Sequence, residues 1–110
     1  MTPRLAIAAA LATSVALAGC GGDAESTAPE SAKVEIAEFE YAPATVRVAA
    51  GGSVTFTNGD RASHTATGDF DTGRLTRGAS KRVPFPEAGR FAYVCAFHPY
   101  MKGVVEVGGG

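Results

Sequence analysis

The C-terminal part of the sequence carries three metal-donor side chains at a regular spacing. Cys95, His98 and Met101 stand three residues apart in a Cys-x2-His-x2-Met segment. Pro99 lies inside this segment and interrupts both helix and strand hydrogen bonding, so the segment is expected to form a loop. A loop of this length is able to place a thiolate, an imidazole and a thioether around a single ion. Soft sulfur ligands select Cu(I), whereas imidazole suits copper and several other metals.

A fourth ligand must come from another part of the chain. His64 is the only other histidine in the sequence, so it is the expected fourth donor. Two imidazoles and a thiolate, with a weak thioether on the axis, form the ligand set of a blue copper site, which suits one-electron transfer between Cu(II) and Cu(I). Such a set leaves no position open for a substrate, and we therefore expect no enzyme activity.

Zinc and a metal-free protein are the alternatives to copper. Thioethers are not usual zinc ligands, and a structural zinc site would rather hold a second cysteine or a carboxylate. Taken separately, Cys95 could be a small buried residue and Met101 a core-filling one, while both histidines could lie in loops or on the surface. A metal-free protein would then serve as an adhesion or interaction module. Because one site explains all of these residues together, we favour copper.

Alternating apolar and polar residues from Lys33 onward predict the short β-strands that position these ligands. The apolar positions of the predicted strands are Val34 and Ile36 with Phe39 near the strand end, Val46 and Val48, Val54 and Phe56, Val83 and Phe85, Phe91, Tyr93 and Cys95, and Val105 and Val107. Turns rich in Gly, Pro and Asn separate them. Pro84 has no N–H to donate, so its strand is expected at a sheet edge. The pattern predicts an all-β sandwich of about seven to eight strands.

The N-terminal region predicts export and lipid attachment rather than folded structure. Arg4 precedes a run of apolar and small residues that is typical of a secretory signal. The run ends in Leu17-Ala18-Gly19-Cys20, which resembles the lipobox of bacterial lipoproteins. By that resemblance, residues 1–19 are a signal peptide and Cys20 is lipidated. Residues 20–32 are rich in Gly, Ser, Pro and acidic residues, so we expect a flexible tether there.

Cys95, the other cysteine of the chain, bears on whether Cys20 is lipidated and on whether a metal is bound. If Cys20 carries a lipid, Cys95 is a lone thiol in an oxidising compartment, where an unoccupied thiol is a hazard. A bound metal would occupy it. The alternative is an ordinary secreted protein with a disulfide between Cys20 and Cys95, but such a bond would close a long loop from a flexible tail.

The overall composition fits one compact domain. The chain has 110 residues, of which 45% are hydrophobic and 19% are charged, and we assign residues 33–110 to a single domain that is expected to be monomeric. The formal net charge of −1 provides no basic surface for nucleic acid. Binding of nucleic acid is therefore not expected.

Further motifs extend the pattern over nearly the whole domain. They are Asn58-x5-His64-Thr65, Phe70-Asp71-Thr72-Gly73 and Gly89-Arg90-Phe91-Ala92-Tyr93-Val94-Cys95. With the short Cys-x2-His-x2-Met loop, they make residues 33–107 resemble the plastocyanin and amicyanin branch of the cupredoxins. The resemblance implies a cupredoxin-like Greek-key β-sandwich and one copper ion held by His64, Cys95, His98 and Met101. It also implies that Asn58 donates its backbone N–H to the sulfur of Cys95, which would raise the reduction potential.

The resemblance to cupredoxins implies a one-electron carrier, and together with the predicted lipid anchor it implies a carrier tethered to a membrane, between extracytoplasmic redox partners. A small apolar surface near His98, Pro99 and Tyr100 would allow a transient redox partner to dock and leave quickly. The lipid on Cys20 would anchor the protein to a bacterial membrane. Amicyanin has no such anchor, so its redox partner is not transferred to this chain. The alternative function is an extracytoplasmic copper carrier or buffer that delivers copper to a cuproenzyme.

Overall fold

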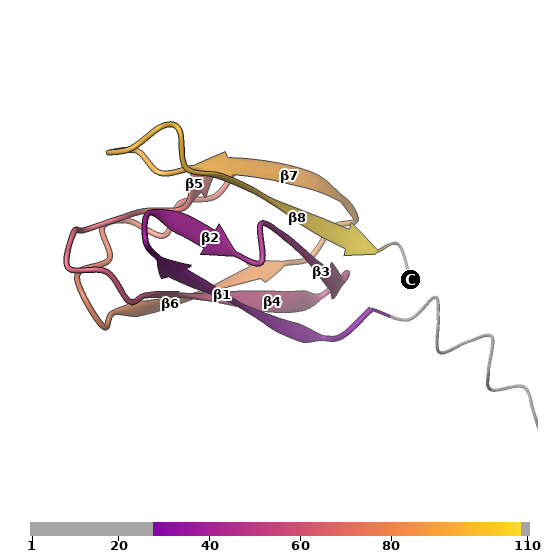
Figure 1. The fold of residues 1–110 in the computed structure, drawn as a ribbon. Helices are drawn as coiled ribbons and strands as arrows, with labels where there is room; N and C mark the ends of the chain where they lie inside the picture. The colour runs from indigo at the N-terminus through magenta and orange to yellow at the C-terminus, as the bar shows by residue number, and fades with distance from the viewer. Residues whose placement is uncertain (1–27, 109–110) are drawn as a thin grey trace, which may run out of the picture.

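The structure is a computed structural model that describes residues 28–108. The predicted signal peptide, residues 1–19, and the predicted lipidation site Cys20 lie outside the described residues. Eight strands follow one another along the described chain (Figure 1). They are β1 (Ser31–Ala37), β2 (Glu40–Ala42), β3 (Thr45–Ala49), β4 (Gly52–Asn58), β5 (Thr67–Gly68), β6 (Ser80–Phe85), β7 (Gly89–Val94) and β8 (Lys102–Gly108).

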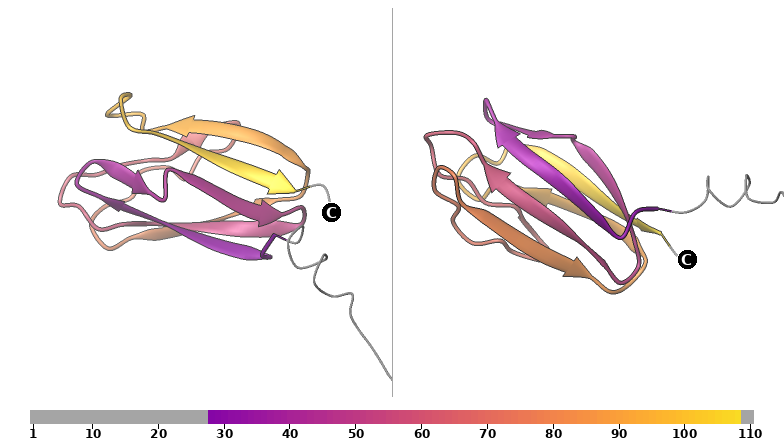
Figure 2. Two further views of the ribbon diagram at one scale, coloured as in Figure 1. Left: turned by 45° about the vertical axis from the view of Figure 1, so that its right-hand side comes forward. Right: turned by 90° about the horizontal axis from the view of Figure 1, so that it is seen from below.

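The strands form two four-stranded sheets with the orders β2-β1-β4-β6 and β3-β8-β7-β5. The sheets face each other as the two layers of a sandwich (Figure 2). The chain crosses between them repeatedly, and β1 with β4 and β3 with β8 are parallel neighbours. The predicted all-β sandwich is confirmed. Within the described range there is no helix that is long and apolar enough to cross a membrane.

The apolar residues of the predicted strands fill the space between the sheets. Val34 and Ile36 of β1 are fully buried, because every second side chain of a strand points to the same face. Pro84 lies in β6, which is one of the two edge strands of its sheet, as predicted. Phe39 differs from the prediction, since β1 ends at Ala37 and Phe39 lies in the turn that follows.

The folded domain begins before residue 33. The carbonyl groups of Pro29 and Glu30 accept hydrogen bonds from the backbone N–H groups of Ala49 and Ser53, at 2.8 and 3.0 Å. Ser31 then opens β1, although the expected tether extended to residue 32. Main-chain pairing with β4 needs no apolar side chain, which explains why the hydrophobic pattern places the boundary too late.

Both ends of the described chain lie at one end of the sandwich. Next to the Pro29 contact, the carbonyl of Gly108 accepts a hydrogen bond from the N–H of Ala50. The loop between β7 and β8 lies at the other end, beside the turn between β1 and β2 (Figure 1). That second end carries the candidate ligands.

Candidate metal centre

Two loops bring three candidate ligands together. His64 comes from the loop between β4 and β5, and Cys95 and His98 come from the loop between β7 and β8. Their donor atoms all lie within 4.8 Å of one another. The Sγ atom of Cys95 is 3.7 Å from Nδ1 of His64 and 3.6 Å from Nδ1 of His98. One thiol and two imidazole nitrogens therefore face a common point, as a mononuclear copper site requires.

The loop between β7 and β8 is closed by its own main chain. The N–H of His98 donates to the carbonyl of Cys95 at 3.3 Å, and the N–H of Met101 donates to the carbonyl of His98 at 2.9 Å. The N–H of Cys95 donates to the carbonyl of Met101 at 3.2 Å. The side chain of Met101 is 2% exposed. Antiparallel pairing of β7 with β8 holds both ends of this loop, so its three donor residues stay at one place in the fold.

The thiol itself is enclosed. Cys95 is fully buried and is the free cysteine of the described residues. His64 is also fully buried, whereas His98 is half-buried and reaches the surface. Of these three candidate ligands, His98 is therefore the one that is partly exposed to solvent.

The predicted hydrogen bond from Asn58 to the sulfur is wrong. The backbone N–H of Asn58 donates to the carbonyl of Ala79 at 3.0 Å. The sulfur of Cys95 instead accepts the N–H of Thr65, with an N–S distance of 3.4 Å. Asn58 ends a strand whose main chain is directed toward its neighbours, whereas Thr65 directly follows a ligand and so lies against the sulfur.

Asn58 does connect the ligand-bearing segments, but through its side chain. Its Nδ2 donates to the carbonyls of Ala62 and Leu75, both at 2.8 Å, and its Oδ1 accepts the N–H of Asp60 at 2.8 Å. The main chains of His64 and Leu75 are in turn hydrogen-bonded to each other at 3.1 and 2.8 Å. Asn58, which is fully buried, thereby fixes the loop that carries His64.

Asp60 holds the side chain of His64. Oδ2 of Asp60 lies 2.9 Å from Nε2 of His64, the ring nitrogen that faces away from the sulfur. A proton shared with this carboxylate leaves Nδ1 free to bind a metal. Burial raises the pKa of the Asp60 carboxyl, but hydrogen bonds from the N–H groups of Phe39 and Glu38 and from His64 hold that pKa below its usual value.

Thr65 links three parts of the site. Besides its N–H bond to the sulfur, its Oγ1 accepts the N–H of Ala96 at 2.8 Å. Its carbonyl accepts the hydroxyl of Tyr41. Burial raises the pKa of that hydroxyl, and the nearby Cys95 and Tyr93 raise it further. Tyr41 is therefore a neutral donor under ordinary conditions.

Three aromatic side chains surround the half-buried imidazole. Phe39, Phe97 and Tyr100 are the exposed large hydrophobic residues of the described chain. Their ring centroids lie 5.0, 6.5 and 6.1 Å from that of His98. The guanidinium carbon of Arg74 lies 5.3 Å from the centroid of the Phe97 ring. The imidazole edge thus reaches the surface inside an apolar patch with a positive charge at its rim.

Three residues of this site were not predicted from the sequence to act there. Asp60 stands in an Asn-Gly-Asp segment that is typical of a turn, although its place four residues before His64 was a usable signal. Thr65 stands beside His64 in one of the quoted motifs, but its bonds to the sulfur and to Tyr41 are made by backbone groups, which every residue type provides. Phe39 reaches the site only because of the turn in which it lies.

Comparison with known proteins agrees with the cupredoxin resemblance seen in the sequence. Residues 5–107 match the model of the cupredoxin-like domain. Amicyanin-alpha from Methylorubrum extorquens is 35% identical over 115 residues, which cover 94% of this chain and 97% of that protein.

Two solved structures share the fold at 26% and 28% sequence identity. A reduced Cu(I) form of an amicyanin mutant at pH 4 superposes with a TM-score of 0.67 and 26% identity, covering 76% of this chain and 88% of that one. A copper-containing nitrite reductase from Thermus scotoductus has a TM-score of 0.66 and 28% identity. That match covers 69% of this chain but only 22% of the reductase.

Proposed function

Because the chain belongs to the cupredoxin-like family, we propose that it is a blue copper protein that carries single electrons. The observation that carries the proposal is the cluster of one buried thiol and two Nδ1 atoms within 4.8 Å. The cofactor is one copper ion, for which His64, Cys95, His98 and Met101 are the ligands. Copper supplies the couple between its two oxidation states, and a fixed ligand geometry keeps the rearrangement between them small.

The chain's own residues prepare the site for this role. The N–H of Thr65 withdraws electron density from the sulfur, which favours the reduced state and raises the potential. Asp60 fixes the orientation of His64. The ligands His64, Cys95 and Met101 are at most 2% exposed. Such burial suits retention of the metal through many redox cycles better than the ready release that a copper carrier needs.

The docking surface of the redox partner is part of the proposal. His98, Pro99 and Tyr100 form its centre, with Phe97 beside them. A small apolar surface of this kind suits a short-lived redox encounter. The exposed Arg74 at its rim favours a partner with negative charge near its own electron port. No enzyme activity is assigned, because the ligand set leaves no position for a substrate.

A charged residue placed on this apolar surface tests whether electrons enter and leave through it. Tyr100→Glu should slow electron self-exchange by about tenfold, because like charges would then meet at the contact surface. The visible spectrum of the copper protein should not change. Ala88→Glu is the matched control, since it adds the same charge at an exposed turn between β6 and β7. Equal rates for the two variants, measured by NMR line broadening, would place the port elsewhere.

The lipid anchor is a separate proposal. The motif ending in Cys20 supports a diacylated N-terminus, and two acyl chains are sufficient for stable membrane attachment. The N-terminal end of the described chain, where Pro29 is hydrogen-bonded to Ala49, lies at the end of the domain opposite the β7–β8 loop (Figure 1). An N-terminal tether would therefore leave the copper end facing away from the anchor, on an extracytoplasmic membrane surface.

Fractionation of bacterial cells tests the anchor. The wild-type protein should sediment with membranes, whereas Cys20→Ser should be recovered in the soluble fraction with its copper spectrum unchanged. Identical distribution of the two proteins would exclude attachment through Cys20.

A further inference from the structure

The turn between β1 and β2 is built from residues that do not suit it. Ala37 pairs with Glu40, so the turn consists of Glu38 and Phe39 alone. Their φ angles are 54° and 62°. A two-residue turn with positive φ at both positions normally contains Asn-Gly, because residues with larger side chains are strained there. A phenylalanine in this conformation is an outlier, and such strain persists when the surrounding structure enforces it.

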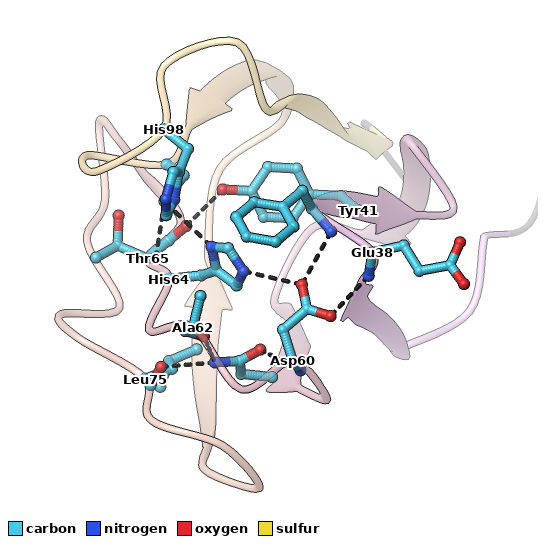
Figure 3. Close-up of polar contacts among 11 residues, drawn as sticks. Glu38, Tyr41, Asp60, Ala62, His64, Thr65, Leu75 and His98 are labelled. Carbon is cyan, nitrogen blue, oxygen red and sulfur yellow. Dashed lines mark hydrogen bonds and ion pairs between the residues drawn. The ribbon is translucent and has the colours of Figure 1, made fainter.

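A single carboxylate holds the strained turn in place. Oδ1 of Asp60 accepts the N–H of Glu38 at 2.7 Å, and Oδ2 accepts the N–H of Phe39 at 2.9 Å. The same Oδ2 lies 2.9 Å from Nε2 of His64. Asp60 thus fastens the turn and the imidazole to each other (Figure 3).

The strained conformation places the Phe39 ring against both histidines. Its centroid lies 5.0 Å from that of His64 and 5.0 Å from that of His98, with interplanar angles of 85° and 86°. The ring remains 39% exposed, so burial in the core does not explain its position. Edge-to-face contacts of this kind are favourable and directional.

Phe39 is a distinctive neighbour for His98. The other aromatic residues that contact His98 are Phe97 and Tyr100, which belong to the same loop and move with it, and His64. Within the described chain, Phe39 is therefore the aromatic contact that reaches His98 from the opposite sheet without being a ligand itself.

We propose that the strained turn is a brace in which Phe39 is a positioning residue that fixes the orientation of His98 relative to His64. By restricting rotation of the half-buried imidazole, the ring keeps the ligand geometry similar in both oxidation states. This inference rests on the proposed copper function. It is distinct from a docking role, which would need an exposed aromatic ring but neither the strained turn nor the contact with Asp60.

The double variant Glu38→Asn with Phe39→Gly separates these roles. It supplies the residues that the turn prefers and removes the ring, so the metal-free protein should resist urea as well as the wild type or better. The copper protein should nevertheless show an altered Cu(II) EPR spectrum, a shifted potential and electron self-exchange slower by about tenfold. Phe39→Tyr, which keeps the ring, should restore all three copper properties.

Phe97→Ala is the matched control. It removes an exposed ring from the same patch, but one whose centroid is 6.5 Å from that of His98, whereas the centroid of Phe39 is 5.0 Å from those of both His64 and His98. A brace predicts that only the Phe39 variant alters the EPR spectrum and the potential. If the two variants leave the spectrum and potential equally unchanged, Phe39 is only a surface residue and the brace is wrong.

Two further outcomes keep the tests separate. If the double variant does not fold, Phe39→Leu provides the same comparison, since it keeps an apolar side chain without a flat ring. A wild-type protein that forms no blue copper site would overturn both the proposed function and the brace. A blue wild-type protein with a variant identical to it would overturn the brace alone.

Discussion

At the scale of single residues, the geometry of the metal site depends on side chains and backbone groups that do not themselves bind the metal. The sulfur of Cys95 accepts the N–H of Thr65, and His64 is oriented by Asp60. Met101 is fixed by main-chain bonds to Cys95 and His98. These contacts tune and orient ligands whose types alone suffice to bind copper.

Met101→Leu tests the axial position. Loss of the thioether removes an electron donor to Cu(II), so the reduced state should become relatively more stable and the potential should rise. A rise of about 59 mV corresponds to a tenfold change in a one-electron equilibrium, and we expect at least that order of change. Cyclic voltammetry measures the shift. An unchanged or lower potential would show that Met101 does not act as an axial ligand.

Thr65→Val tests the link between the two ligand loops. The variant keeps the backbone N–H to the sulfur but removes the Oγ1 that accepts the N–H of Ala96. Loss of that acceptor should lower the free energy of unfolding by about 1 kcal/mol. Thr65→Ser keeps the hydroxyl and should retain most of the stability. Urea unfolding of the metal-free proteins decides the matter, and equal losses in both variants would contradict the role of the hydroxyl.

The candidate ligands could be proposed from the sequence because their types are scarce and their spacing is regular, and the structure brings the donor atoms of His64, Cys95 and His98 within 4.8 Å of one another. Cys95, His98 and Met101 needed no knowledge of the fold, and His64 followed as the remaining histidine. The partner of the sulfur could not be predicted, because a backbone N–H is present at almost every residue and only its direction distinguishes one from another. Asn58 illustrates the limit, since its importance was predicted but its hydrogen bonds were not.

At the scale of strands, alternation predicted the long elements and missed the short ones. The core strands β1, β4 and β8 have buried residues at every second position. In contrast, β2 has three residues with only Tyr41 buried, and β5 has two residues. Elements of two or three residues contain too few repeats for alternation to be recognised in the sequence, so tertiary pairing defines them.

Two buried tyrosines, one in β2 and one in β7, differ in whether their hydroxyl group is hydrogen-bonded. Tyr41 of β2 donates its hydroxyl to the carbonyl of Thr65. Tyr93 of β7 is 2% exposed, and its Oη is the buried side-chain polar atom of the described residues that lacks a hydrogen-bond partner. The two rings pack together with centroids 4.7 Å apart, so they provide a matched pair in one core.

Phenylalanine at each position tests this difference. Tyr41→Phe should lower the free energy of unfolding by about 1 kcal/mol, because it leaves a buried carbonyl without its donor. Tyr93→Phe should have no cost or should stabilise the protein, because it removes a polar group that has been desolvated without compensation. Chemical denaturation of both variants measures the contrast. A larger loss for Tyr93→Phe than for Tyr41→Phe would contradict the hydrogen-bond assignments.

At the scale of the whole molecule, the sandwich keeps the two ends of the described chain away from the candidate metal site. Pro29 and Gly108 lie together at one end, and the loop from Cys95 to Met101 lies at the other (Figure 2). Long paired strands connect the ends and keep the ligand loops in fixed positions. With a formal net charge of only −1, long-range electrostatic attraction should be weak, and we propose that the local apolar patch around His98 governs the encounter with a redox partner.

The central claim is that this chain builds a blue copper site. Its most direct test is the visible absorption and EPR spectrum of residues 28–110, which retain all eight strands, after addition of Cu(II). We predict an intense thiolate-to-copper band and narrow copper hyperfine splitting, both of which Cys95→Ser should abolish. A colourless protein, or one that binds zinc in preference to copper, would contradict the account.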